Sequence, residues 1–369
     1  MSAIDCRLTS HSLSQHLNQA YTGFNLLHKQ GRIRLTQQCS RTPIQTFDDQ
    51  HLANSGETHL RVLLNGGIRI HYDCHDSYEI SVENLGQCDL YFKRSFSRPY
   101  VDTLPSGREK VHPLGLNYSV LPDFADLHAL QRARVLGIGP REKLLASIEA
   151  LDGGNLVRYS ARLRDLEAAP DLQGTAQVLF LVNAYDPHDR PDRTKQKIEQ
   201  YIEINQVRAQ CIRLLRKNFG PRFLGGFSHT IYARRTYPDL LVERQSITRK
   251  RNYLKALKSY CICVATTGLH GSIGWKFAEY VALSKAVVSE PLQYEVPGNM
   301  EEGRNYLVFE SPNDCAEACT RLMDDRDARA RLMFNNALYY RSYVRPDTLV
   351  LNTLLQALAS AKQPPRDCV

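Results

Sequence analysis

The segment from residue 266 to residue 291 holds, at close spacing, the residue types that a nucleotide site needs. Gly271, Ser272 and Gly274 let the backbone approach a phosphate closely, because small residues permit tight turns. Lys276 follows and supplies a positive charge for the phosphate. Glu279 comes next, and a carboxylate accepts hydrogen bonds well from the diol of a ribose. These five residues predict a nucleotide site, with an ordinary turn before a solvated helix as the alternative.

Regular elements flank these residues on both sides. Residues 260–265 (YCICVA) and 286–289 (AVVS) are short apolar runs, which are typical of buried strands. We expect a helix between them that opens at residues 270–272 and ends near residues 284–285. Strand, glycine loop, helix and strand make a parallel βαβ unit. Ligands of such units lie at the carboxyl ends of the strands and at helix N-termini.

The charge of the chain favours an anionic partner. Its net charge is +8 and its pI is about 8.9. The densest basic cluster, residues 244–258, comes directly before the strand at 260–265. Arg251 in this cluster is a candidate to contact a diphosphate, and a solvated helix face explains the cluster equally well. The basic residues do not alternate with aromatic residues that would stack on bases, so we expect no nucleic-acid partner.

A second group of polar residues lies in the N-terminal half. Residues 62–64 and 68–72 are joined by Asn65-Gly66-Gly67, which predicts an antiparallel hairpin, and the next strand is expected at 89–93. Asp73, His75 and Asp76 follow the second hairpin strand directly. Each of these side chains can take a proton from a hydroxyl, so they are candidate catalytic bases. A turn that Asp and His residues cap is the alternative.

The length of 369 residues favours two domains. The polar residues 151–175 are the best candidate for a linker, and strands alternate with helices from residue 176 to residue 310, which predicts a doubly wound parallel domain. The chain has no run of about 18 apolar residues, and its N-terminus lacks the layout of a signal peptide. We therefore expect a cytoplasmic protein, with peripheral association with a membrane as a variant.

A longer pattern extends from Gly271 to Asp325. It runs from the glycine turn and the helix with Glu279 through residues 296–298 (VPG) and a strand at 305–309 to residues 311–314 (SPND) and 322–325 (LMDD). This pattern resembles the donor-binding half of GT-B fold glycosyltransferases of group 1. The order of the elements extends the resemblance back to Gln177.

The resemblance implies roles for particular residues. In that family two glutamates stand eight positions apart at the start of the helix, and the second commonly binds the ribose of the nucleotide. Glu279 stands at the second position and Gly271 at the first. The neighbouring His270 is a candidate to replace the missing glutamate. The implied donor-binding set is Arg251, His270, Gly271, Ser272, Gly274, Lys276 and Glu279, with no metal ligand and no cofactor.

The resemblance also implies an architecture and a reaction. We expect an α/β fold with two Rossmann-like domains that face each other across a cleft. Residues 1–165 would bind the acceptor, residues 176–345 the nucleotide-sugar, and a helix in residues 346–369 would cross back to the first domain. The implied reaction moves a sugar from a nucleotide-sugar to a hydroxyl of a glycan, a lipid or another acceptor without a metal, with an anionic membrane surface as a further partner. A non-catalytic nucleotide-sugar-binding module and a sugar-nucleotide epimerase of the same fold are the alternatives.

Overall fold

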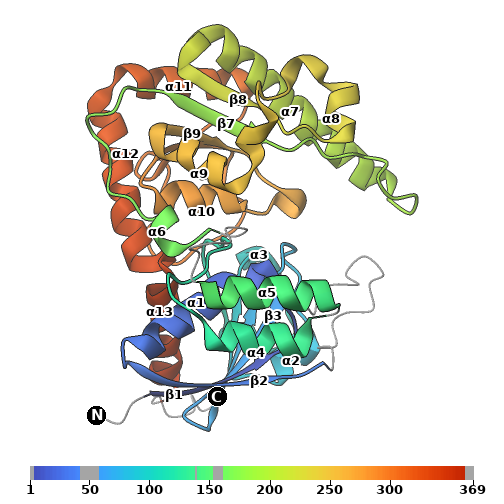
Figure 1. The fold of residues 1–369 in the computed structure, drawn as a ribbon, viewed down its shortest axis with the longest axis vertical. Helices are drawn as coiled ribbons and strands as arrows, with labels where there is room; N and C mark the ends of the chain where they lie inside the picture. Colours follow the sequence, from blue (N-terminus) through green and yellow to red (C-terminus); the bar gives the residue numbers. More distant parts are fainter. Residues whose placement is uncertain (1–3, 42–57, 138, 153–160, 362–369) are drawn as a thin grey trace. The chain divides into compact units, whose positions relative to one another are not determined.

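The structure is a computed structural model that describes residues 4–41, 58–137, 139–152 and 161–361. The chain forms two compact α/β units (Figure 1). Unit 1 comprises Met1–Asp165, Gln293–Gly298 and Arg341–Val369, and unit 2 comprises Leu166–Leu292 and Asn299–Tyr340. Each unit has its own sheet and its own buried core. The predicted α/β class is confirmed.

Unit 1 is built on a mixed sheet of six strands in the order β2-β1-β3-β4-β5-β6. The strand β3 runs antiparallel to both of its neighbours, and the other pairs are parallel. The predicted hairpin is confirmed: β3 and β4 pair from His59↔Asp73 to Leu64↔Ile68. Asn65 and Gly66 both have positive φ, and Gly67 donates its backbone N–H to the carbonyl of Leu64, which closes the turn. The elements are β1 (Ile4–Ser10), α1 (Asn18–Lys29), β2 (Ile33–Cys39), β3 (His59–Leu64), β4 (Ile68–Asp73), α2 (Val82–Gly86), β5 (Leu90–Lys93), α3 (Arg98–Asp102), β6 (Val111–Pro113), α4 (Leu127–Leu136) and α5 (Pro140–Asp152).

The helix α13 (Pro346–Ser360) completes the core of unit 1. It lies beside α1, which comes from the other end of the chain (Figure 1). Gly23 of α1 makes this close approach possible, because a Cβ atom at this position would lie 2.2 Å from the carbonyl oxygen of Pro346. Leu349, Val350 and Leu354 of α13 are buried against residues of the sheet.

Unit 2 is built on a parallel sheet of five strands in the order β11-β10-β9-β7-β8. The strands β7, β9 and β10 are buried along their whole length, which explains why they read as continuous apolar runs in the sequence. The elements are α6 (Leu163–Leu166), which joins the two units, β7 (Val178–Val182), α7 (Lys195–Phe219), β8 (Phe223–Phe227), α8 (Ile231–Thr236), α9 (Lys250–Ser259), β9 (Ile262–Ala265), α10 (Trp275–Ala282), β10 (Ala286–Ser289), β11 (Tyr306–Val308), α11 (Pro312–Asp324) and α12 (Arg326–Tyr339).

The helix α10 is shorter at both ends than the sequence predicts. His270 and Gly271 have φ values of 59° and 68°, and an α-helix does not continue through this left-handed region, so α10 begins only at Trp275. At the other end Ser284 has a φ of 55°, and Lys285 donates its backbone N–H to the carbonyl of Tyr280. This is the arrangement of a Schellman C-cap, and it ends the helix at Ala282.

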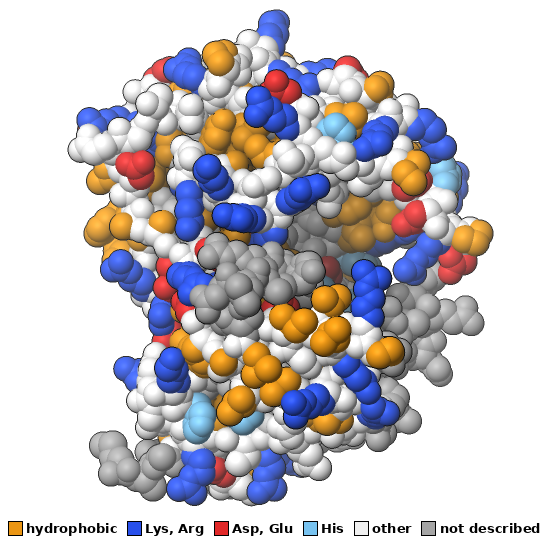
Figure 2. All heavy atoms as spheres, in the orientation of Figure 1, with side chains coloured by type: hydrophobic (Ala, Val, Ile, Leu, Met, Phe, Trp, Pro, Cys, Tyr) orange, Lys and Arg blue, Asp and Glu red, His pale blue; other side chains and the backbone are white. Residues whose placement is uncertain are grey.

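The predicted linker at residues 151–175 corresponds only in part to exposed chain. Residues 153–160 lie outside the described residues. Leu163 and Leu166 are buried, so the residues around them pack into the protein, whereas most of residues 168–175 are exposed. Figure 2 shows the surface in the orientation of Figure 1, with Lys and Arg side chains gathered in a band over the region of α9.

Candidate functional site

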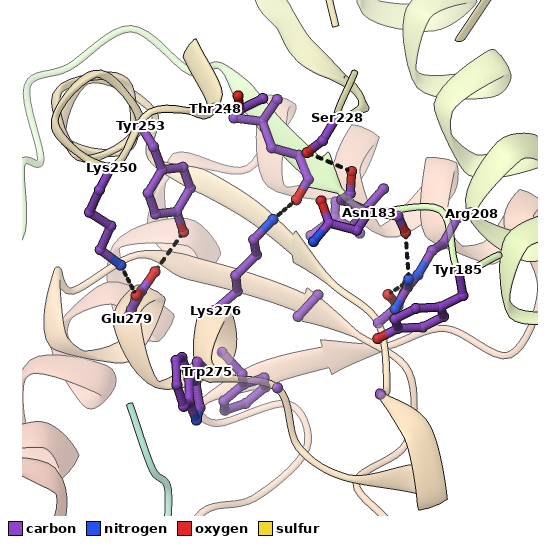
Figure 3. A pocket seen from close by; sticks show the side chains of 18 residues that line it. Asn183, Tyr185, Arg208, Ser228, Thr248, Lys250, Tyr253, Trp275, Lys276 and Glu279 are labelled. Atoms are coloured by element: carbon purple, nitrogen blue, oxygen red, sulfur yellow. Dashed lines mark hydrogen bonds and ion pairs between the residues drawn. The ribbon is translucent and has the colours of Figure 1, made fainter. Parts of the chain in front are cut away.

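A cavity of about 360 Å³ lies at the carboxyl ends of β7 and β9 in unit 2. These two strands are neighbours in the sheet, but the chain passes from β7 to β8 on one side before it returns to β9 on the other. Such a reversal of strand order leaves a crevice in which ligands of open α/β sheets bind. The polar side chains that line it are Asn183, Tyr185, Arg208, Ser228, Thr248, Lys250, Tyr253, Thr266, Trp275, Lys276 and Glu279, most of which Figure 3 labels.

Glu279 is buried in the wall of this cavity and both of its carboxylate oxygens are engaged. Oε1 forms an ion pair with Lys250, and Oε2 accepts a hydrogen bond of 2.8 Å from the hydroxyl of Tyr253 (Figure 3). Lys250 and Tyr253 both belong to α9, so this helix fixes the orientation of the carboxylate. Each oxygen has a second lone pair, and Glu279 can therefore still accept a hydrogen bond from a ligand.

Lys276 lies in the first turn of α10 and points into the cavity (Figure 3). Its ammonium group donates a hydrogen bond to the carbonyl of Leu181 at the end of β7. Burial lowers the pKa of Lys276 to about 8; Glu279 acts in the opposite direction, while Arg208 and Lys250 lower the pKa further. An anion in the cavity would offset this desolvation and raise the pKa again.

Arg208 of α7 is a cavity residue that the sequence pattern did not reveal. It is buried, and its guanidinium donates to Thr266 Oγ1 at 3.0 Å, to the carbonyl of Asn183 at 2.8 Å and to the carbonyl of Thr267 at 3.2 Å. It therefore ties the loops after β7 and β9 together. The only local signal is an arginine on the apolar face of a long helix, next to buried Ala209.

The N-terminus of α10 faces the same cavity. Its N-cap is Gly274, which has no side chain to occupy the first turn. The end of a helix carries a partial positive charge from its backbone N–H groups. Together with Lys276 and Lys250, this end gives the cavity a positive character that suits a phosphate group.

Some of the predicted donor-binding residues lie outside the cavity lining. Arg251 is exposed on α9, and its neighbour Lys250 lines the cavity instead. His270 lies 3.3 Å from Lys197, measured from Nε2 to Nζ. Ser272 is buried beside the lining residue Gly268, to which its carbonyl is hydrogen-bonded. Gly271 lies in the turn between His270 and Ser272. Three of the seven predicted residues therefore line the cavity, namely Gly274, Lys276 and Glu279. The four that do not are Arg251, His270, Gly271 and Ser272.

Asp73, a candidate base in unit 1, is buried in a network of polar side chains. Its Oδ2 lies 2.8 Å from the ammonium of Lys93 and accepts a hydrogen bond of 2.6 Å from Tyr91, and Oδ1 accepts from the backbone N–H of His75. Burial raises the pKa of Asp73, but the charges of Lys93 and His59 and the hydrogen bonds from Lys93 and Tyr91 together lower it more, so that this pKa lies well below its ordinary value. The carboxylate is therefore already neutralised by partners within unit 1.

His75 and Asp76 lie in the loop after β4 and are half-buried. Nδ1 of His75 accepts a hydrogen bond from the backbone N–H of Ser77, so the neutral ring carries its proton on Nε2. Burial and the charge of Lys93 lower the pKa of His75 to about 4. Asp76 forms an ion pair with the buried Arg94, and its side chain is 37% exposed. Of the three candidate bases, Asp73 is thus buried, and His75 and Asp76 are partly open to solvent.

Two further properties bear on function. Among the described residues, no group of three or more His, Cys, Asp and Glu side chains is arranged to hold a metal ion. No helix within the described part of the chain is long and apolar enough to span a bilayer.

Comparison with known proteins gives distant likenesses. No family model matches the chain, and no curated protein matches it. Among solved structures, the C-terminal domain of a Glycosyl Transferase Group 1 family protein (LpcC) from Francisella tularensis is 14% identical with a TM-score of 0.31, over 49% of this chain and 96% of that chain. An alpha1,3-fucosyltransferase is 11% identical with a TM-score of 0.42, over 97% of this chain and 90% of that chain.

A UDP-GlcNAc 2-epimerase from Neisseria meningitidis is also similar, with 14% identity and a TM-score of 0.36, over 74% of this chain and 62% of that chain. All three TM-scores are below 0.5. With two α/β units, a parallel sheet of the order β11-β10-β9-β7-β8 and the pattern from Gly271 to Asp325, the chain is similar to GT-B glycosyltransferases and distant from them in sequence.

Proposed function

We propose that the protein is a glycosyltransferase that binds a nucleotide-sugar in the cavity of unit 2 and transfers the sugar to an acceptor hydroxyl. One observation carries this proposal. At the switch point of the parallel sheet, the cavity combines a helix N-terminus and two lysines with a buried carboxylate. The lysines and the helix end suit a diphosphate, and Glu279 suits the hydroxyl groups of a ribose.

The bound donor would divide its contacts between these groups. The diphosphate would lie against the N-terminus of α10 at Gly274, with Lys276 beside it. Lys250 would move from its ion pair with Glu279 towards the second phosphate, which frees Glu279 Oε1 for a ribose hydroxyl. Trp275, which also lines the cavity, offers an aromatic face.

In the transfer step the acceptor oxygen forms a bond to the anomeric carbon of the sugar. The bond between that carbon and the diphosphate oxygen breaks, and the electron pair leaves with the nucleoside diphosphate. The proton of the acceptor hydroxyl passes to a base, for which we propose Asp76. Lys276 and the helix end stabilise the charge that develops on the leaving diphosphate, a role that requires no metal ion.

A non-catalytic nucleotide-sugar-binding module is the second candidate. It is favoured by the engagement of the three candidate bases, since Asp73 pairs with Lys93, Asp76 pairs with Arg94, and His75 presents a proton on Nε2. This candidate predicts the same nucleotide binding without turnover.

A thermal-shift series with UDP, GDP, CDP, ADP and dTDP and their common sugars tests the proposal. We expect one nucleotide family to stabilise the protein, because a ligand that binds only the folded state raises its stability. Glu279→Ala and Lys276→Ala should abolish this shift in folded protein, while Lys258→Ala, an exposed control on α9, should retain it. No shift with any nucleotide would contradict both candidates. A shift without release of nucleoside diphosphate from any donor and acceptor pair would favour the binding module.

A further inference from the structure

The surface beside the cavity carries a large excess of positive charge. Residues 234–258 contain eight Lys and Arg side chains and only two acidic ones, in a chain whose net charge is +8. The segment includes the end of α8 and nearly all of α9, and it reaches the cavity through Thr248 and Lys250. Figure 2 shows Lys and Arg side chains gathered over the region of α9. We refer to the exposed residues Arg234, Arg244, Arg249, Arg251, Lys255 and Lys258 as the basic surface.

Three of these residues form a row along α9. Arg251, Lys255 and Lys258 stand at helical positions i, i+4 and i+7, which lie on one side of a helix, and all three are exposed. With a rise of 1.5 Å per residue, the row is about 10 Å long. The opposite side of the helix, with Tyr253 and Leu257, is buried in unit 2. The row is therefore held rigidly and points outward.

The basic surface lacks acidic partners of its own. Among the described residues, none of its six members forms an ion pair, whereas other exposed arginines do, such as Arg69 with Asp89 at 2.8 Å and Arg213 with Asp239 at 3.6 Å. Arg234 donates only to the neutral amide of Gln245 at 3.3 Å, a contact that joins α8 to the segment before α9. Like charges so close together repel one another, and an anionic partner relieves that repulsion.

We propose that the basic surface binds an acceptor with repeating anionic groups and guides its end to the cavity. This inference rests on the proposed transferase function and names the acceptor class for the same site. A row of about 10 Å is longer than a single phosphate group needs, and it matches an extended chain with phosphate or carboxylate groups at intervals. Lys250 is the link, because it stands both in the charged segment and in the cavity wall.

The details of α9 disfavour two other anionic partners. A helix that docks on a membrane inserts its own apolar face into the bilayer, but the apolar face of α9 is buried in the core of unit 2. A single-stranded nucleic acid needs aromatic faces on which bases stack, and the aromatic residue of α9, Tyr253, is buried. A soluble anionic chain needs only the exposed charges.

Fluorescence anisotropy with labelled polyanions tests the inference in three proteins: the wild type, the variant Arg244→Gln/Lys255→Gln/Lys258→Gln, and the control Lys217→Gln/Arg222→Gln/Arg331→Gln. The control removes the same charge from exposed positions elsewhere in unit 2. The probes are a short oligogalacturonate, which carries carboxylates, and a linear polyphosphate. Vesicles of phosphatidylcholine with phosphatidylserine and a mixed-sequence DNA oligonucleotide represent the other partners.

We expect the wild type to bind at least one of the two soluble polyanions, more weakly at about 200 mM salt than at about 50 mM. The variant in the basic surface should bind about tenfold more weakly, and the control should bind like the wild type. Equal losses in both variants, or tighter binding of vesicles or DNA than of both soluble polyanions, would overturn the inference. So would the absence of any polyanion binding.

A nucleotide thermal shift on the same samples separates the two proposals. The basic-surface variant should keep the shift of the wild type, because its three residues lie outside the cavity lining. If nucleotides stabilise the wild type but the wild type binds no polyanion, this inference is overturned and the proposed transferase function is not. Polyanion binding without any nucleotide shift overturns the proposed transferase function, and with it the identification of the polyanion as an acceptor.

Discussion

Tyr253 holds Glu279 in place: its hydroxyl donates a hydrogen bond of 2.8 Å to Oε2 of the buried carboxylate. The ring of Tyr253 also lies near both lysines of the cavity, with Lys250 Nζ at 5.4 Å and Lys276 Nζ at 5.6 Å from its centroid. One buried side chain thus contacts the three charged groups on which the proposed donor site depends.

Tyr253→Phe should weaken nucleotide binding about tenfold, since a hydrogen bond to a charged group contributes roughly 1.5–3 kcal/mol. The ring and its packing remain, so the fold should persist. Isothermal titration of the nucleotide that gives the thermal shift measures the effect. Tyr260→Phe, which changes a half-buried tyrosine outside the cavity, is the matched control. Equal affinities of Tyr253→Phe and the wild type would show that Glu279 needs no such support.

The lowered pKa of Lys276 predicts that donor binding takes up protons. At pH 8 about half of the Lys276 side chains are protonated, and a bound diphosphate raises their pKa, so binding should take up about half a proton. Affinity should fall as the pH rises above 8, because the neutral amine must first be protonated. Titration calorimetry with a nucleotide-sugar in two buffers of different ionisation enthalpy measures the uptake.

Lys276→Arg is the informative variant for this prediction. An arginine stays charged throughout, so the variant that still binds should show no proton uptake and a flat affinity between pH 7 and pH 9. The same uptake in Lys276→Arg and the wild type would assign the titration to another group.

Gly274→Ala should reduce nucleotide binding without unfolding the protein. A Cβ atom at this position would meet no heavy atom closer than the carbonyl oxygen of Thr266 at 3.9 Å, so the fold has room for it. The methyl group would stand at the N-terminus of α10, where we place the diphosphate. Circular dichroism checks the fold and a nucleotide titration checks the site.

Gly226→Ala provides the contrast. Gly226 has a φ of 148°, and a Cβ there would lie 2.7 Å from the backbone of Leu240, so this variant should be destabilised. If Gly274→Ala binds nucleotide like the wild type, the turn at Gly274 is an ordinary helix start.

The buried histidine pair in unit 1 predicts a loss of stability in mild acid. Nδ1 of His59 lies 2.8 Å from Nε2 of His71, and burial lowers the pKa of both rings below 6.5. Around and below pH 6.5 the unfolded chain therefore binds more protons at these two histidines than the folded chain does. His71, whose pKa lies well below 6.5, should cost up to about 1.4 kcal/mol of stability at pH 5.5, and His59 acts in the same direction. The neighbouring carboxylate of Asp73 raises the pKa of both rings, and the charges of Lys93 and Arg61 lower it.

Urea unfolding at pH 7.5 and pH 5.5 measures this loss. His59→Gln/His71→Phe should lose less stability between the two pH values than the wild type does, whatever its stability at pH 7.5. His188→Gln, which changes an exposed histidine of unit 2, should behave like the wild type. An unchanged pH dependence in the double variant would contradict the prediction.

Turnover, where the transferase proposal holds, should survive removal of divalent ions. In the proposed step Lys276 and the N-terminus of α10 stabilise the charge on the leaving diphosphate. EDTA should therefore leave the initial rate of nucleoside diphosphate release within about twofold of the rate without EDTA. A loss of rate that added Mg²⁺ or Mn²⁺ restores would refute the metal-free step.

The strands of unit 2 could be predicted from the sequence because buried parallel strands are short apolar runs. Strands are predicted at residues 260–265 and 286–289, and β9 and β10 lie there. The predicted ends of α10 were wrong because the real ends depend on the left-handed conformation of His270 and Ser284. Residues other than glycine seldom adopt this conformation, so the sequence does not indicate it. Arg208 was missed because its partners come from two distant loops.

The helix α1 had no visible signal for a related reason. It buries Gln19, Thr22 and Asn25, polar residues that interrupt an apolar stripe. Their hydrogen bonds run to Val344, Val120 and Asp126, far away in the sequence. Only tertiary structure satisfies these groups, so no local pattern marks the helix.

The position of α13 in the core of unit 1 has a consequence for biosynthesis. Unit 2 has all of its residues once Tyr340 has left the ribosome, but unit 1 lacks Leu349, Val350 and Leu354 until the chain has been made beyond α13. The face of α1 around Gly23 stays uncovered during that time. The domain translated first is therefore the one that matures last, and a nascent chain that stalls before Pro346 would expose this apolar face to chaperones.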